Sequence, residues 1–104
     1  MVVRTVGALS THRCAAVHAI NDQSAKLDGV SPFGEATLLA LTSPAVEHLI
    51  AGDGIGYAQI DPRFGSAELS VHPDHRGRGI GREFLSAVLA LAPEVKLWAH
   101  GNLP

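Results

Sequence analysis

The sequence has very little cysteine and no long apolar run. Cys14 is the only cysteine among the 104 residues, so an intrachain disulfide is impossible and a reducing, cytoplasmic location is expected. Near the N-terminus, Arg4, His12 and Arg13 interrupt the apolar residues. No stretch is long enough for the apolar region of a signal peptide or for a spanning helix. We therefore expect neither secretion nor a membrane partner.

Positive charge is also scarce, and where it occurs it is local. Eight Lys and Arg stand against ten Asp and Glu, a net charge of −2, which argues against a nucleic-acid partner. The apolar content of 46% and the absence of repeats predict one globular domain over residues 1–104. Three arginines and three glycines nevertheless fall within the seven positions from Arg76 to Arg82. Such a local cluster points to a binding site.

Apolar periodicity and turn residues predict the order of the secondary-structure elements. The pattern favours helices over 10–25, 35–41 and 80–92, and strands over 46–51, 55–61, 66–72 and 94–100. Pro73 ends the third strand because proline cannot donate to a ladder. The order of two helices, three strands, a glycine loop, a helix and a strand predicts an α/β or α+β sandwich.

The glycine loop between strand and helix has the features of a pyrophosphate site. Glycines let a ligand approach the main chain, the helix start offers unpaired N–H groups, and arginines add charge-assisted bonds. A P-loop would need Lys and Ser/Thr after Gly81, and a dinucleotide fingerprint would follow the first strand of a βαβ unit. Neither fits, which disfavours a nucleotide-binding regulatory module. On the residues alone, a plain glycine turn with solvated arginines stays open.

Residues 71–81, V-x-P-x-x-R-G-x-G-I-G, resemble the acetyl-CoA loop of the GNAT acyltransferases. The Arg/Gln-x-x-Gly-x-Gly core of that family falls on Arg76, Gly79 and Gly81. The segments LDGVSPFGE (27–35) and LWAHGN (97–102) are similar to the amino-terminal half of the mycothiol synthase branch. The resemblance implies a GNAT acyl-CoA N-acyltransferase fold, cut short after its fifth strand and lacking a further helix and two strands.

The same resemblance implies the chemistry and its site. The donor would be acetyl-CoA, and the acceptor a small-molecule amine, the cysteinyl amine of cysteinyl-glucosaminyl-inositol. The strand backbone of Leu69, Ser70 and Val71 would pair with the pantetheine arm. The residues implied to hold the pyrophosphate are Arg76, Gly77, Arg78, Gly79, Ile80, Gly81 and Arg82.

Two acids are candidates for the acceptor side. Glu35 would contact the aminosugar, as the resemblance implies; read alone, it is an acid in the first turn of a helix. Amine acetylation must remove an ammonium proton, and the resemblance implies a base on the strand over 66–72, which makes Glu68 the candidate general base. The alternative interpretation of Glu68 is a polar residue that faces outward on an alternating strand.

Other polar residues near the loop have simpler interpretations. Tyr57 is the only tyrosine and so the only phenol able to protonate a leaving thiol, but its place on the earlier hairpin favours packing. His72 and His75 flank the loop without a third ligand, so no metal is expected. His100 on the last strand could face the acyl site.

We therefore expect an acetyl-CoA-dependent N-acetyltransferase domain. The alternative is a non-catalytic acyl-CoA-binding or structural domain, because the resemblance implies that the second domain of mycothiol synthases performs catalysis. The last strand, 94–100, would be an uncovered edge carrying Val95, Leu97 and Trp98. Pairing with a second GNAT domain, or self-association through this edge, is expected.

Overall fold

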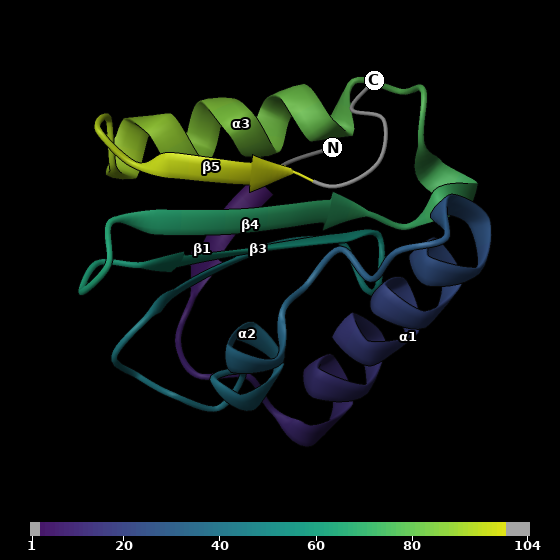
Figure 1. Cartoon of the computed structure of the whole chain (residues 1–104), viewed down its shortest axis with the longest axis horizontal. Coiled ribbons are helices and arrows are strands. Elements are labelled where there is room, and N and C mark those ends of the chain that lie inside the picture. The colour runs from purple at the N-terminus through teal and green to yellow at the C-terminus, as the bar shows by residue number, and fades with distance from the viewer. Residues whose placement is uncertain (1–2, 100–104) are drawn as a thin grey trace.

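The computed structural model describes residues 3–99 and shows one sheet between two helical layers (Figure 1). The five strands follow one another across the sheet in the order β1-β2-β3-β4-β5. Neighbours from β1 to β4 are antiparallel, and β5 joins β4 in parallel. The elements are β1 (Val3–Val6), α1 (Thr11–Asp28), α2 (Glu35–Leu39), β2 (Glu47–Ala51), β3 (Gly56–Asp61), β4 (Ser66–Val71), a 3-10 turn (Pro73–His75), α3 (Ile80–Leu91) and β5 (Lys96–Ala99).

Helix α3 covers one face of the sheet, and α1 and α2 cover the other (Figure 1). Successive side chains of a strand point to opposite faces, so β4 sends Ala67, Leu69 and Val71 toward α3. Glu68 and Ser70 between them face α1 and α2, where they contact Thr37 and Ser24. The predicted alternation along this strand is therefore confirmed. The polar face of the strand is covered by helices, which is why Ser70 is buried.

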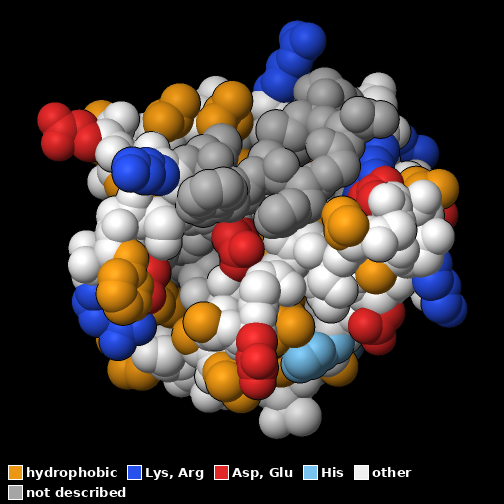
Figure 2. All heavy atoms as spheres, in the orientation of Figure 1, with side chains coloured by type: hydrophobic (Ala, Val, Ile, Leu, Met, Phe, Trp, Pro, Cys, Tyr) orange, Lys and Arg blue, Asp and Glu red, His pale blue; other side chains and the backbone are white. Residues whose placement is uncertain are grey.

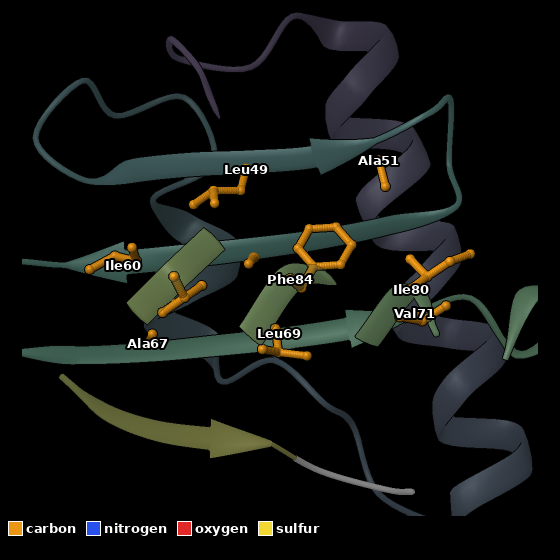
Figure 3. Close-up of a cluster of buried hydrophobic side chains, with 10 residues drawn as sticks. Leu49, Ala51, Ile60, Ala67, Leu69, Val71, Ile80 and Phe84 are labelled. Carbon is orange, nitrogen blue, oxygen red and sulfur yellow. The ribbon is translucent and has the colours of Figure 1, made fainter. Parts of the chain in front are cut away.

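The core beneath α3 is built around one aromatic ring. Phe84 is fully buried and lies at the centre of a cluster that includes Leu49, Leu69 and Ile80 (Figure 3). The ring fits because the strand below it begins with Gly56: a Cβ there would lie 2.4 Å from Cε2 of Phe84. The glycine thus sets how closely α3 approaches the sheet.

The core beneath α1 and α2 is smaller and more polar. Val17 and Ile20 of α1 meet Ile50 and Tyr57 of the sheet. Ser10 begins α1 by accepting a hydrogen bond from the Arg13 N–H group at 3.3 Å, as an N-cap residue does. The left-handed Gly29 (φ 80°) ends the helix.

Within residues 3–99, the sequence predicted every α-helix and every strand except β1, and it did not predict the 3-10 turn. The observed bounds differ by a few residues. The first helix runs three residues further than 10–25, and the last strand is described only from Lys96 to Ala99. His100 lies outside the described residues. No helix within residues 3–99 combines the length and apolar character needed to cross a membrane. The α+β arrangement agrees with the expected fold class.

Candidate functional site

Strand β4 leads directly into the glycine loop. The described pairing with β5 runs from Ser66↔Lys96 to Leu69↔Ala99. Ser70 and Val71 continue to pair with Tyr57 and Gly56 of β3 on the other side. Strand β3 thus pairs with the backbone of β4 up to Val71, after which the loop begins.

The loop itself depends on two glycines in the left-handed region. Gly77 and Gly79 both have φ of 80°, a conformation that side-chain-bearing residues rarely adopt. A Cβ on either would meet no atom within 4 Å, so both residues face open space. No steric contact requires glycine at these two positions. Glycine is favoured here by the left-handed backbone conformation, and it also lets a ligand approach the main chain.

Helix α3 begins directly after Gly79 with its N-terminus uncapped by any described side chain. The N–H group of Glu83 makes the first intrahelical bond, to the Gly79 carbonyl at 3.2 Å. The N–H groups of Ile80, Gly81 and Arg82 precede it and have no partner within the helix. They lie at the positive end of the helix dipole, so this loop and helix start together suit an anion such as pyrophosphate.

The three arginines of the loop have different surroundings. Arg78 and Arg82 are exposed. Arg76 is turned back into the protein, where its guanidinium donates to both carboxylate oxygens of Asp28 at 2.9 Å. This bidentate contact holds the pKa of Asp28 below its usual range. That Arg76 contacts phosphate stays a prediction, and in this structure its side chain is engaged elsewhere.

Glu68 lies on the sheet face under α2, where it caps that helix. Its carboxylate accepts from the Gly34 N–H group at 3.2 and 3.3 Å and from the hydroxyl of Thr37. Gly34 is the N-cap residue of α2 and has no side chain of its own to do this. Half-buried, Glu68 also lines a cleft of about 240 Å³ together with Thr37, Gln59 and Asp61.

The structure brings the two candidate acids to the same helix end. Glu35 is the exposed first residue of α2, directly after the Gly34 that Glu68 contacts from 34 positions away. On the face drawn in Figure 2, acidic side chains lie near the centre and also at the left and right margins, where Lys and Arg side chains lie as well.

Beneath α2 lies a buried network of hydrogen-bonded polar side chains, which no pattern in the sequence indicated. His48 donates through Nε2 to the Ser43 carbonyl at 2.7 Å, so its Nδ1 accepts the hydrogen bond from the Tyr57 hydroxyl at 2.6 Å. The same hydroxyl accepts from Gln59 at 3.0 Å, and Gln59 donates also to the Thr37 carbonyl at 3.0 Å. Every side chain of this network has a hydrogen-bond partner, and Thr37 links the network to Glu68.

The packing interpretation of Tyr57 is confirmed. The side chain is fully buried, its ring meets Phe33 edge-to-face at 5.6 Å, and burial raises the pKa of its phenol. His72 accepts from the Asp74 N–H group at 3.1 Å and so caps the 3-10 turn. No group of three metal-ligating side chains occurs in the part of the chain that the structure describes. Cys14 on α1 is half-buried.

Comparison with known proteins agrees with this geometry. A family described as the acetyltransferase (GNAT) domain matches residues 44–103, the segment that holds β2 to β5, the glycine loop and α3. The chain therefore belongs to the GNAT family of acetyltransferase domains. Members of this family generally use acetyl-CoA as the acyl donor.

Its relatives include several mycothiol acetyltransferases. The protein of Thermobispora bispora is 44% identical over 86% of this chain and 33% of its own length. Those of Streptomyces avermitilis and Rhodococcus opacus are 43% and 38% identical, over 96% and 88% of this chain and 36% and 34% of their own. The chain thus spans about a third of the length of these relatives, at their amino-terminal end.

Proposed function

We propose that this chain forms the acetyl-CoA-binding part of an N-acetyltransferase domain of the mycothiol acetyltransferase type. One observation carries the proposal: two left-handed glycines face open space at an uncapped helix start, immediately after β4. In such a site, main-chain N–H groups bind an anion without any side chain between ligand and backbone.

The ligand would lie along β4 and over the loop. The backbone of Leu69, Ser70 and Val71, the last residues of β4 before the loop, would pair with the pantetheine arm. The pyrophosphate would lie against the N–H groups from Gly77 to Arg82. Arg78 and Arg82, both exposed, would add charge-assisted bonds.

Acetyl-CoA supplies a thioester-activated acetyl group. Glu68 would take one proton from the acceptor ammonium, which leaves a neutral amine. The amine nitrogen then bonds to the acetyl carbon, the carbon–sulfur bond breaks, the nitrogen loses its second proton and the thiolate gains a proton. Glu35 would hold the aminosugar of cysteinyl-glucosaminyl-inositol. The acids share one end of α2 beside a cleft, which supports an amine pocket there.

A second candidate function, acyl-CoA binding without chemistry, has its own support. The carboxylate of Glu68 already accepts from Gly34 and Thr37, so its contacts are accounted for by capping α2. A carboxylate has about four lone-pair sites, and an incoming amine would compete for the remaining ones. The relatives are also about three times as long as this chain, so the missing chemistry could belong to another part.

Thiol release from acetyl-CoA, measured with and without cysteinyl-glucosaminyl-inositol, separates the two functions. A catalyst releases thiol only with the acceptor and at a rate that falls by about a hundredfold or more in Glu68→Gln. The matched control, Glu94→Gln, changes an exposed acid after α3 and should not alter the rate. Binding of CoA without acceptor-dependent release would support the binding-only function.

We further propose that the sheet continues past β5, in a second GNAT domain or in another copy of this chain. Strand β5 is the last strand of the described sheet, and a strand edge presents unpaired backbone groups. Sedimentation should show association that rises with concentration, whereas a concentration-independent monomer would contradict self-association. A cytoplasmic location stays a prediction from the single cysteine.

A further inference from the structure

The side chain of Arg76 joins the start of the glycine loop to the end of β4 and to α1, which is distant in sequence. Besides the two bonds to Asp28, its Nη2 donates to Ser24 at 3.2 Å and its Nε donates to the Val71 carbonyl at 3.1 Å. Asp28 and Ser24 belong to the last turns of α1, and Val71 is the last residue of β4. One guanidinium thus ties the start of the glycine loop to α1 and to the end of the strand.

The contact is well shielded from water. The side chains of Arg76 and Asp28 are 16% and 15% exposed, and Ser24 is fully buried beside Ser70, with 3.4 Å between their hydroxyl oxygens. By comparison, the His12–Asp53 pair is 76% and 72% exposed. Shielded, bidentate pairs fix geometry in a way that exposed pairs do not. Figure 1 shows the turn after β4 lying against the C-terminal end of α1, where this contact forms.

The loop is anchored at its far end by Ile80, which is buried in the core under α3. Between Arg76 and Ile80, a Cβ on Gly77 or Gly79 would contact nothing within 4 Å, so no contact on that side of either glycine orders this stretch. Glycine also loses the most conformational freedom when it is ordered. A loop of this kind binds well only if something else orders it before the ligand arrives.

We propose that Arg76 and Asp28 act as a positioning pair that orders the pyrophosphate loop, so that CoA affinity depends on a carboxylate in α1. This inference rests on the proposed function, because it assumes that the loop binds CoA. Arg76 would act through the main-chain N–H groups of the loop, and Arg78 and Arg82 would supply the charge that meets the phosphates. Ser24 completes the arrangement by fixing Nη2.

The proposal predicts an effect whose sign is opposite to that of simple electrostatics. Removing the negative charge of Asp28 near a phosphate site should strengthen anion binding if charge alone mattered, and it would release Arg76 to bind phosphate. If Asp28 instead holds Arg76 in place, Asp28→Asn weakens CoA binding. We expect a loss of about tenfold.

The test is calorimetric titration of the full chain with CoA for the parent, Asp28→Asn, Arg76→Gln and the double variant. The proposal expects both single variants to lose affinity and the double variant to lose no more than the larger single loss, since the two residues act as one unit. Asp53→Asn, which alters an exposed pair, serves as control and should bind like the parent. Thermal unfolding of each variant shows whether it is folded at the titration temperature.

The outcomes distinguish a failure of the proposed function from a failure of the positioning role of Arg76 and Asp28. If the parent does not bind CoA, the proposed function is wrong. If the parent binds and Asp28→Asn binds equally well or more tightly, the positioning role is wrong while the proposed function stands. Should Asp28→Asn fail to fold, Ser24→Ala replaces it: this change removes one of the bonds to Arg76, and an affinity loss of about threefold is expected. Unchanged affinity in a folded Ser24→Ala variant would then refute the inference.

Discussion

Substituting Gly56 by alanine would test how the sheet positions α3. The new Cβ would lie 2.4 Å from Cε2 and 3.0 Å from Cζ of Phe84, and 3.3 Å from the carbonyl oxygen of Ser70. Carbon atoms in contact are normally about 3.5–4.0 Å apart, so the ring would have to move by about 1 Å. Phe84 is fully buried among close neighbours, and such overpacking costs about 1–3 kcal/mol.

We expect Gly56→Ala to lower the free energy of unfolding by about 2 kcal/mol and the melting temperature by on the order of 10 °C. CoA affinity should fall as well, because Phe84 lies in the second turn of α3, the helix that begins at the loop. Urea denaturation and calorimetric titration measure the two effects. Gly7→Ala is the control: a Cβ there meets nothing within 4 Å, and we expect a change below about 0.5 kcal/mol.

A double variant shows whether the ring is the cause. In Gly56→Ala/Phe84→Leu, the smaller side chain leaves room for the new methyl group. The two changes should therefore destabilise the protein by less than the sum of their separate effects. Additive effects, or a Gly56→Ala variant as stable as the parent, would refute the reasoning.

Three further predictions follow from polar contacts. Tyr57→Phe removes the hydroxyl that donates to His48 and accepts from Gln59, and should cost about 1–3 kcal/mol in urea denaturation; unchanged stability would contradict the assigned bonds. Because the pKa of Asp28 is lowered in the folded state, its pair stabilises above the unfolded pKa of about 3.9 and is lost as the pH falls through the folded value. The stability difference between the parent and Asp28→Asn should thus be constant above about pH 5 and shrink below about pH 4, and a difference that grows in acid would reverse this sign. Glu68→Gln should lower the melting temperature whether or not the chain is a catalyst, since Glu68 caps α2; a melting temperature like that of the parent would show that the capping contact contributes nothing.

The elements with strong periodicity were predictable, and the first strand was not. Helix α3 repeats apolar residues at helical spacing, and β4 alternates cleanly, so each carries its own signal. Strand β1 is short and places Arg4 and Thr5, both exposed, between two valines. Only its pairing with β2, from Val3↔Ala51 to Val6↔His48, makes it a strand, and a local pattern does not contain that pairing.

The candidate site could be proposed from the sequence, but the partners of its side chains could not be predicted. The left-handed glycines and the helix start follow from residues that are adjacent in the chain. The contact between Arg76 and Asp28 joins residues 48 positions apart, and Glu68 meets Gly34 across 34 positions. Each of these side chains has a role that depends on which element the fold places beside it.

Calorimetric titration with CoA of the parent, Gly79→Asp and Gly65→Asp tests the central claim most directly. Gly79 and Gly65 both have positive φ, 80° and 60°, and a Cβ on either meets nothing within 4 Å, so the two changes impose similar backbone strain and the same charge. Gly79 lies in the loop, whereas Gly65 lies in the turn between β3 and β4. If the pyrophosphate binds at the loop, the parent and Gly65→Asp bind CoA alike and Gly79→Asp shows no binding. Equal binding by the parent and a folded Gly79→Asp variant would contradict the account.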